Sequence, residues 1–197
     1  MEKTVATHAN QIESDIAHIM HVKKYLLHTK FKDVTEEDIR NGGADRSMLV
    51  EIAVSVCGGL LHTPMNGYDH SDGSDTKSVT TRKRDTLDTY SARVGDTNNK
   101  KGLLRVQVYE KFSGRFYYFA IPYWAHSQAG NDLEIPFTDT GDPRRIPNGY
   151  RTTPNWWDFQ CNTFEEMCKV KNDGTKPSPT TTTLLDLFEF PKARVDD

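Results

Sequence analysis

The only acid-x-lysine triplet of the chain is Asp75-Thr76-Lys77. Two further aspartates, Asp69 and Asp72, stand shortly before it. Successive side chains of an extended strand alternate between its faces, so Asp75 and Lys77 should point the same way. Phosphodiester hydrolysis uses such a set, because carboxylate oxygens hold Mg²⁺ while a cation orients the nucleophile or offsets developing charge. The spacing therefore predicts a metal-dependent site, against the alternative that the pair is a solvated face.

A carboxylate also stands in an apolar stretch upstream. Residues 48–57 predict a mostly buried helix that ends at Gly58-Gly59, and Glu51 and Ser55 are its only polar residues. A lone carboxylate on such a helix is costly to bury without a partner. Either this stripe faces water, or Glu51 points into the metal site as a ligand or as a group that orients one.

Together these segments resemble a known catalytic core. Met48-Leu49-Val50-Glu51-Ile52, a glycine-containing break, Asp69 and then residues 73–78 are similar to the PD-(D/E)xK nucleases. The similarity is greatest to the branch that holds the MutH mismatch-repair nuclease and related type II restriction endonucleases, and it covers residues 45–80. It implies that Glu51 is the helix acid, Asp69 the first strand acid, Asp75 the second and Lys77 the lysine. Asp72 is the alternative to Asp69, so the implied metal ligands are Asp69, Asp72, Asp75 and Glu51.

The same resemblance implies an activity, an endonuclease that cleaves double-stranded DNA with Mg²⁺, for which Mn²⁺ can substitute. The few scattered cysteines and the lack of an apolar N-terminal segment lead us to expect a cytoplasmic location. Type II enzymes commonly cut both strands of a palindrome, which favours a homodimer, although MutH-like relatives can act as monomers.

Hydrophobic patterning predicts the elements that position these residues. Residues 12–27 have apolar positions at helical spacing, and a short helix should begin at Thr35. Residues 103–124 read as a β-hairpin that turns at Ser113-Gly114 and continues the sheet begun at Asp75. We therefore expect an α/β fold with a mixed central sheet flanked by helices, and the resemblance implies that this fold is restriction-endonuclease-like.

The chain length fits a single nuclease domain of 197 residues. Its expected parts are N-terminal helices in 1–44, a catalytic core in 45–125, an irregular DNA-contacting region in 126–176 and a C-terminal segment in 177–197. Within the last part, residues 177–183 read as a Pro/Thr linker and 184–190 as an apolar segment that docks on the body.

Candidate DNA contacts occur where cations and amides cluster. The net charge of -3 argues weakly against DNA binding, which depends on local basic stretches rather than on the total. Arginine and lysine neutralise phosphates, and arginine and asparagine can also read bases. The candidates are Arg82, Lys83, Arg84, Asn98, Asn99, Lys100, Arg144, Arg145, Asn148 and Arg151.

The cysteines, tryptophans and histidines give weaker indications of function than the acidic segment does. The three cysteines are too few for a disulfide framework, and a zinc site on Cys161 and Cys168 lacks a histidine at a suitable spacing as its third ligand. No apolar run approaches membrane-spanning length, so no membrane partner is expected. We expect the Trp156-Trp157 pair in the core, and the histidines of the first helix (His8, His18, His21 and His28) at the surface. The main alternative to a nuclease is a non-catalytic DNA-binding or interaction protein whose acidic loop is incidental.

Overall fold

The structure is a computed structural model of the chain. Among the candidate DNA contacts, Arg84, Asn98, Asn99, Lys100, Asn148 and Arg151 lie outside the described residues, as do the linker and the apolar segment of the C-terminal part. The described residues are 2–25, 33–41, 46–63, 67–83, 90–95, 102–128, 133–145 and 156–172.

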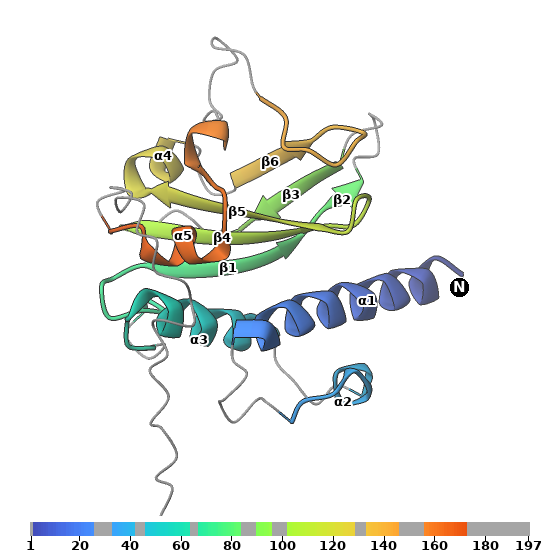
Figure 1. The fold of residues 1–197 in the computed structure, drawn as a ribbon. Helices are drawn as coiled ribbons and strands as arrows, with labels where there is room; N and C mark the ends of the chain where they lie inside the picture. Colours follow the sequence, from blue (N-terminus) through green and yellow to red (C-terminus); the bar gives the residue numbers. More distant parts are fainter. Residues whose placement is uncertain are drawn as a thin grey trace, which may run out of the picture.

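The described part of the chain forms a mixed α/β fold (Figure 1). Its helices are α1 (Glu2–Tyr25), α2 (Glu36–Arg40), α3 (Arg46–Gly58), α4 (Tyr123–Gln128), the 3₁₀ helix η2 (Trp156–Phe159) and α5 (Phe164–Lys169). Its strands are β1 (Asp75–Thr80), β2 (Arg82–Lys83), β3 (Tyr90–Val94), β4 (Leu103–Glu110), β5 (Arg115–Pro122), β6 (Leu133–Phe137) and β7 (Gln160–Cys161).

Two sheets form the centre of the molecule. The first has the order β1-β4-β5-β7, with β1 parallel to β4 and the other pairs antiparallel. The second has the order β2-β3-β6 and is antiparallel throughout. Helices α1 and α3 lie along one side of the first sheet, and β3, β6 and α4 lie on the other (Figure 1). The expected mixed sheet flanked by helices is therefore confirmed.

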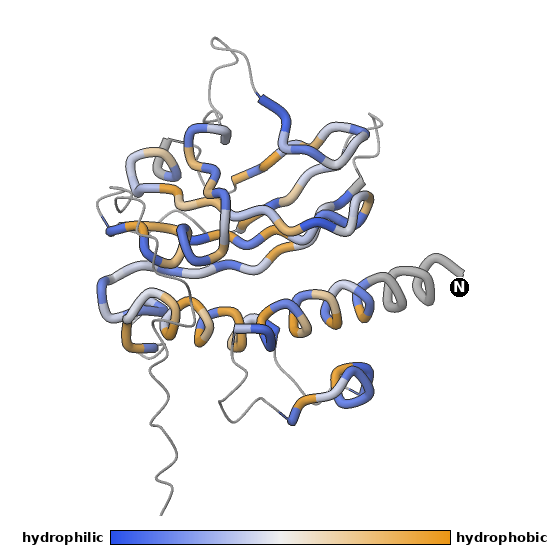
Figure 2. Tube along the Cα trace, viewed as in Figure 1, coloured by the Kyte–Doolittle hydropathy of each residue, from blue (hydrophilic) through white to orange (hydrophobic). Residues whose placement is uncertain are grey.

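Alternation along β4 separates two hydrophobic cores. Leu103 packs with residues of α1, α3 and α5, whereas Leu104, Val106 and Val108 pack with the second sheet. Figure 2 shows many hydrophobic residues in α3, whereas β1, at the edge of the first sheet, is mostly hydrophilic. Because β1 runs in register beside β4, the β4 pattern also fixes which face each β1 side chain occupies.

The predicted hairpin is confirmed, since β4 and β5 pair antiparallel from Leu103↔Pro122 to Glu110↔Arg115. Gly114 has a φ of 67°, a conformation that only glycine adopts readily, and this explains its place in the turn. The Glu110 carboxylate accepts the N–H groups of Phe112 (2.8 Å) and Ser113 (2.6 Å), which stabilises the same turn. Strand β1 pairs in parallel with β4 of this hairpin.

The predicted helices are also present. The short second helix has Thr35 as its N-cap, and a reciprocal capping box joins Thr35 and Asp38. In α1 the apolar face buries Ile16, Ile19 and Val22. The expectation of a surface position was wrong for His18, which is fully buried.

His18 is buried because its ring finds both apolar and polar partners. The imidazole packs edge-on against Tyr109 (5.4 Å between ring centroids) and Phe116 (5.3 Å), and its Nδ1 bonds to the Ser14 carbonyl oxygen (2.9 Å). Burial foremost lowers the pKa of His18 to about 3, so the ring is neutral at pH 7. His21, one turn further on, stacks on Phe116 at 4.1 Å and is half-buried.

The region 126–176 is more regular than expected, because it contains β6, η2, β7 and α5. The expectation for the tryptophan pair holds for one of its members. Trp156 is fully buried and donates from Nε1 to the Glu134 carbonyl oxygen (2.6 Å), whereas Trp157 is exposed. All three cysteines are buried, and none forms a disulfide.

Candidate functional site

The segment between α3 and β1 folds back on itself and places Asp69 beside the first sheet. His62 and His70 form an isolated antiparallel bridge, and Ser71 N–H donates to the Leu61 carbonyl oxygen (2.9 Å). Gly73, with a φ of 79°, then reverses the chain into β1. We call residues 69–75 the acidic turn.

Asp69 lies against the strand that carries the acid-x-lysine triplet. Strand β1 is at the edge of its sheet, and the Thr76 N–H donates to Asp69 Oδ2 (2.7 Å). Lys77 Nζ is 3.9 Å from the same oxygen. Both side chains are half-buried, so this ion pair is partly shielded from water. The structure thus brings together Asp69 and Lys77.

Asp75 begins β1 and is buried, with 3% of its surface exposed. It pairs in register with Leu104, and Lys77 pairs with Val106, so both side chains lie on the face turned to the second sheet. Thr76, on the opposite face, bonds through Oγ1 to His70 Nε2 (2.6 Å). The strand therefore separates the Asp75–Lys77 face from the helix face, as the alternation predicted.

Glu51 approaches the same place from α3. Its Oε2 is 3.0 Å from His62 Nε2 in a hydrogen bond that joins the helix to the chain before the acidic turn. Burial foremost raises the pKa of Glu51, and the negative charge of Asp69 adds to this, while the His62 hydrogen bond and the Lys77 charge lower it. Glu51 therefore lies within electrostatic reach of both Asp69 and Lys77.

Nothing in the sequence marks His62 as a site residue. It follows a leucine pair in a loop, and no ligand spacing marks it. Its relation to Glu51 depends on how the loop folds back on α3, which local pattern does not predict.

Asp72, the alternative first ligand, is engaged elsewhere. It accepts the Ser74 N–H (3.0 Å) and the Ser74 hydroxyl, and its Oδ2 lies 3.2 Å from Arg105 Nη2. Burial raises its pKa, but the Ser74 hydrogen bonds and the Arg105 charge outweigh this and hold the pKa of Asp72 below its usual value. Its charge is therefore matched to a buried guanidinium, which favours Asp69 as the first ligand.

The predicted four-residue metal set is not gathered in one place. Within the described residues, no group of three or more histidine, cysteine, aspartate or glutamate side chains is arranged to hold a metal ion. Mg²⁺ usually takes one or two protein carboxylates and completes its shell with water and substrate phosphate oxygens. Asp69 accepts the N–H of Thr76, the residue that follows Asp75, so these two aspartates are the pair that we take forward for such a site.

Three of the predicted DNA-contacting side chains are described, and all three are exposed. Arg82 is in β2 at one edge of the second sheet. Arg144 and Arg145 follow β6 at the other edge, where Arg144 N–H donates to the Pro136 carbonyl oxygen (2.7 Å). The backbone of Lys83 lies beside Arg82 in β2.

Comparison with known proteins identifies no relative of this chain. No protein-family model matches the chain, and no curated protein or solved structure matches it either. None of the helices that the structure describes is both long enough and apolar enough to cross a membrane. A functional interpretation therefore depends on the residues and on their geometry.

Proposed function

We propose that the protein is a Mg²⁺-dependent endonuclease that cleaves double-stranded DNA, a type II restriction endonuclease of the PD-(D/E)xK kind. One observation carries the proposal. The Asp69 carboxylate contacts the Thr76 amide and lies 3.9 Å from the ammonium of Lys77, on the strand that Asp75 begins. Two segments that are separate in the sequence thus meet where carboxylate and lysine chemistry would be needed.

In this proposal, Asp69, Asp75 and Lys77 form the catalytic group. Asp69 and Asp75 would hold Mg²⁺, or Mn²⁺ in its place, through hard carboxylate oxygens. When bound, the ion polarises the phosphodiester and acidifies a water molecule. Lys77 places a positive charge beside the attacking water or the phosphate and offsets the charge that develops there.

Glu51 supports the group from α3. Its half-buried carboxylate forms a hydrogen bond with His62, and the charges of Asp69 and Lys77 both affect its pKa. In this position Glu51 orients water or a ligand without needing to bind the metal directly.

DNA is held by side chains outside this group. Exposed Arg82, Arg144 and Arg145 would neutralise phosphates along the second sheet. The sequence offers further candidates for DNA contact in Lys83, Arg84, Asn98, Asn99, Lys100, Asn148 and Arg151.

A homodimer in the cytoplasm completes the proposal. A twofold protein matches a twofold DNA site, so each subunit would cut one strand. Sedimentation of the protein on an uncleavable duplex tests this, and a complex of one subunit with one duplex would contradict it.

The direct test uses metal-stripped protein and a long DNA of defined sequence. Adding Mg²⁺ should produce discrete fragments whose mapped ends share one sequence, and the Asp75→Asn variant should produce none. If the protein bound DNA equally well with and without the metal and left it intact, the alternative of a non-catalytic DNA-binding protein would hold instead.

A further inference from the structure

The acidic turn is attached to a distant part of the chain by a buried arginine. Arg105, on β4, has only 1% of its surface exposed. It stands in register with Thr76, so its side chain points to the face opposite Asp75 and Lys77. Burying a guanidinium is costly unless its donors are satisfied, and its surroundings show how this is done.

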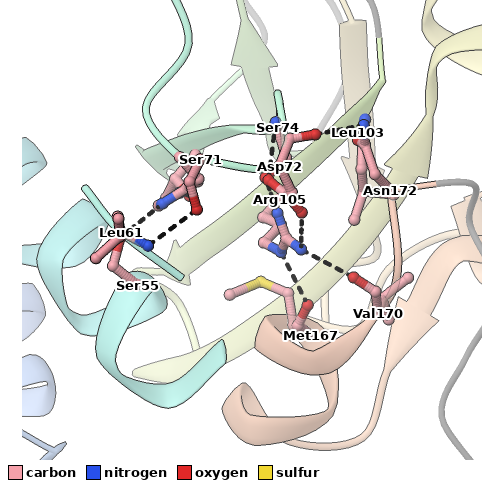
Figure 3. A network of polar contacts seen from close by, with 12 residues as sticks. Ser55, Leu61, Ser71, Asp72, Ser74, Leu103, Arg105, Met167, Val170 and Asn172 are labelled. Atoms are coloured by element: carbon pink, nitrogen blue, oxygen red, sulfur yellow. Dashed lines mark hydrogen bonds and ion pairs between the residues drawn. The ribbon is translucent and has the colours of Figure 1, made fainter. Parts of the chain in front are cut away.

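Arg105 donates to two segments at once (Figure 3). On one side, Nε donates to the Met167 carbonyl oxygen (3.3 Å) and Nη2 to the Val170 carbonyl oxygen (2.8 Å), at the C-terminal end of α5. On the other side, Nη2 reaches Asp72 Oδ2 (3.2 Å) and Nη1 donates to the Ser74 hydroxyl. One side chain thereby joins the end of α5 to the acidic turn.

Asn172 makes a second connection between the same two segments. Its Nδ2 donates to the Asp72 carbonyl oxygen (2.7 Å), and its Oδ1 accepts the Leu103 N–H (2.6 Å). Gly102 leaves the room for this, since a Cβ there would lie 2.6 Å from Asn172 Oδ1. The asparagine amide therefore bridges the turn and the start of β4 in a slot that only glycine permits.

These contacts bear on Asp69 through the turn itself. Within it, His70 N–H donates to the Ser74 carbonyl oxygen (3.2 Å) and Gly73 N–H to the His70 carbonyl oxygen (2.9 Å). Holding Asp72 and Ser74 in place thus holds the backbone from which Asp69 reaches the Thr76 amide.

We propose that Arg105 and Asn172 are positioning residues, through which residues 167–172 hold the acidic turn so that Asp69 stays beside Thr76 and Lys77. The catalytic consequence rests on the proposed nuclease function, whereas the structural consequence does not. Neither residue touches the Asp75–Lys77 face of β1.

The test uses Asn172→Ala, because the change is small and the side chain is only half-buried. Asn162→Ala, an exposed asparagine ahead of α5, is the matched control. Amide exchange of Thr76 and Ser74, measured by NMR on the DNA-free protein, should become about fivefold to tenfold faster in Asn172→Ala. On cleaved DNA, kcat should fall between about tenfold and a hundredfold while KM changes little. The control should match the parent in both measurements.

Two further variants separate the contacts. Asn172→Asp keeps an acceptor for the Leu103 N–H but loses the donor to Asp72, so it should loosen the turn as the alanine variant does. Arg105→Lys keeps the charge but cannot reach both segments, and it should accelerate exchange at Ser74 and Thr76 as well.

The two proposals fail in different ways. Unchanged exchange at Thr76 in Asn172→Ala would overturn the positioning role, whatever the activity. Faster exchange with an unchanged kcat would overturn its relevance to the site. A parent protein that never cuts DNA would overturn the nuclease function, and amide exchange alone would then decide the positioning role.

Discussion

Lys77 Nζ lies 3.9 Å from Asp69 Oδ2, although the two residues belong to different segments, the acidic turn and strand β1. The same carboxylate oxygen accepts the Thr76 N–H, so the turn and the strand are joined twice at one point. This contact defines the candidate site.

Glu51 should matter less than the strand carboxylates. If it orients water or a ligand, Glu51→Gln should lower kcat by about tenfold to a hundredfold, because a group that acts through another costs that much. His62→Ala should have a similar effect, since it removes the hydrogen bond that holds Glu51. Single-turnover cleavage with Mg²⁺ measures both, and a complete loss of cleavage in Glu51→Gln would show that it is a direct ligand.

Arg144 and Arg145 should contribute to DNA affinity through phosphate contacts. Replacing both with alanine should weaken binding and reduce the slope of log affinity against log salt by up to about two, because each lost contact retains its counterions. The double variant Lys24→Ala with Arg40→Ala removes the same charge from the exposed surface of α1 and α2 and should leave the slope unchanged. An unaltered slope in the Arg144 and Arg145 variant would show that these two side chains do not contact DNA phosphates.

Arg105 should be far more important for stability than an exposed arginine. Arg105→Met leaves the buried carbonyl oxygens of Met167 and Val170 without this donor and Asp72 without its cation. The free energy of unfolding should fall by about 3–5 kcal/mol. Arg115→Met, which breaks the exposed pair with Asp142, should cost less than about 1 kcal/mol. Urea titrations compare the two, and equal losses would contradict the importance assigned to Arg105.

Stability should decrease in mild acid because of buried histidines. Burial lowers the pKa of His18 to about 3 and that of His70 to about 4, below the ordinary value of 6.5. The unfolded chain therefore binds protons that the folded chain does not, so stability is complete above pH 6.5 and falls as the pH drops toward 4. Urea unfolding between pH 7 and 4.5 should show this loss, and His18→Phe should reduce the slope by up to about one proton. A variant with the parent's slope would contradict the account of His18.

Local features of this fold could be predicted from the sequence, whereas contacts between distant segments could not. Alternation placed Asp75 and Lys77 on one face of β1, and turn and capping residues located the hairpin and the second helix, because these depend on neighbours in the chain. The contact between Arg105 and Asp72 spans 33 residues and was not foreseen. Periodicity tells which side of an element is buried, but it does not tell which distant group will meet a buried charge.

His18 and His62 illustrate the same limit. A histidine on an amphipathic helix is commonly a surface residue, and the rings of Tyr109 and Phe116 on the neighbouring strands help to make the burial of His18 favourable. His62 acquires a role because its loop folds back onto α3. Both depend on tertiary contacts that no local pattern encodes.

The nuclease assignment is tested most directly by cleavage of cognate DNA with Mg²⁺ in the variants Asp75→Asn and Lys77→Ala. Each should lose cleavage while remaining folded and able to bind DNA, because the first removes a metal ligand and the second removes the charge beside the reacting phosphate. Asp69→Ala should behave as Asp75→Asn does. Circular dichroism and DNA binding without metal provide the controls, and removal of a carboxylate can even tighten that binding. A folded Lys77→Ala protein that cuts at close to the parent rate would contradict the assignment of this site.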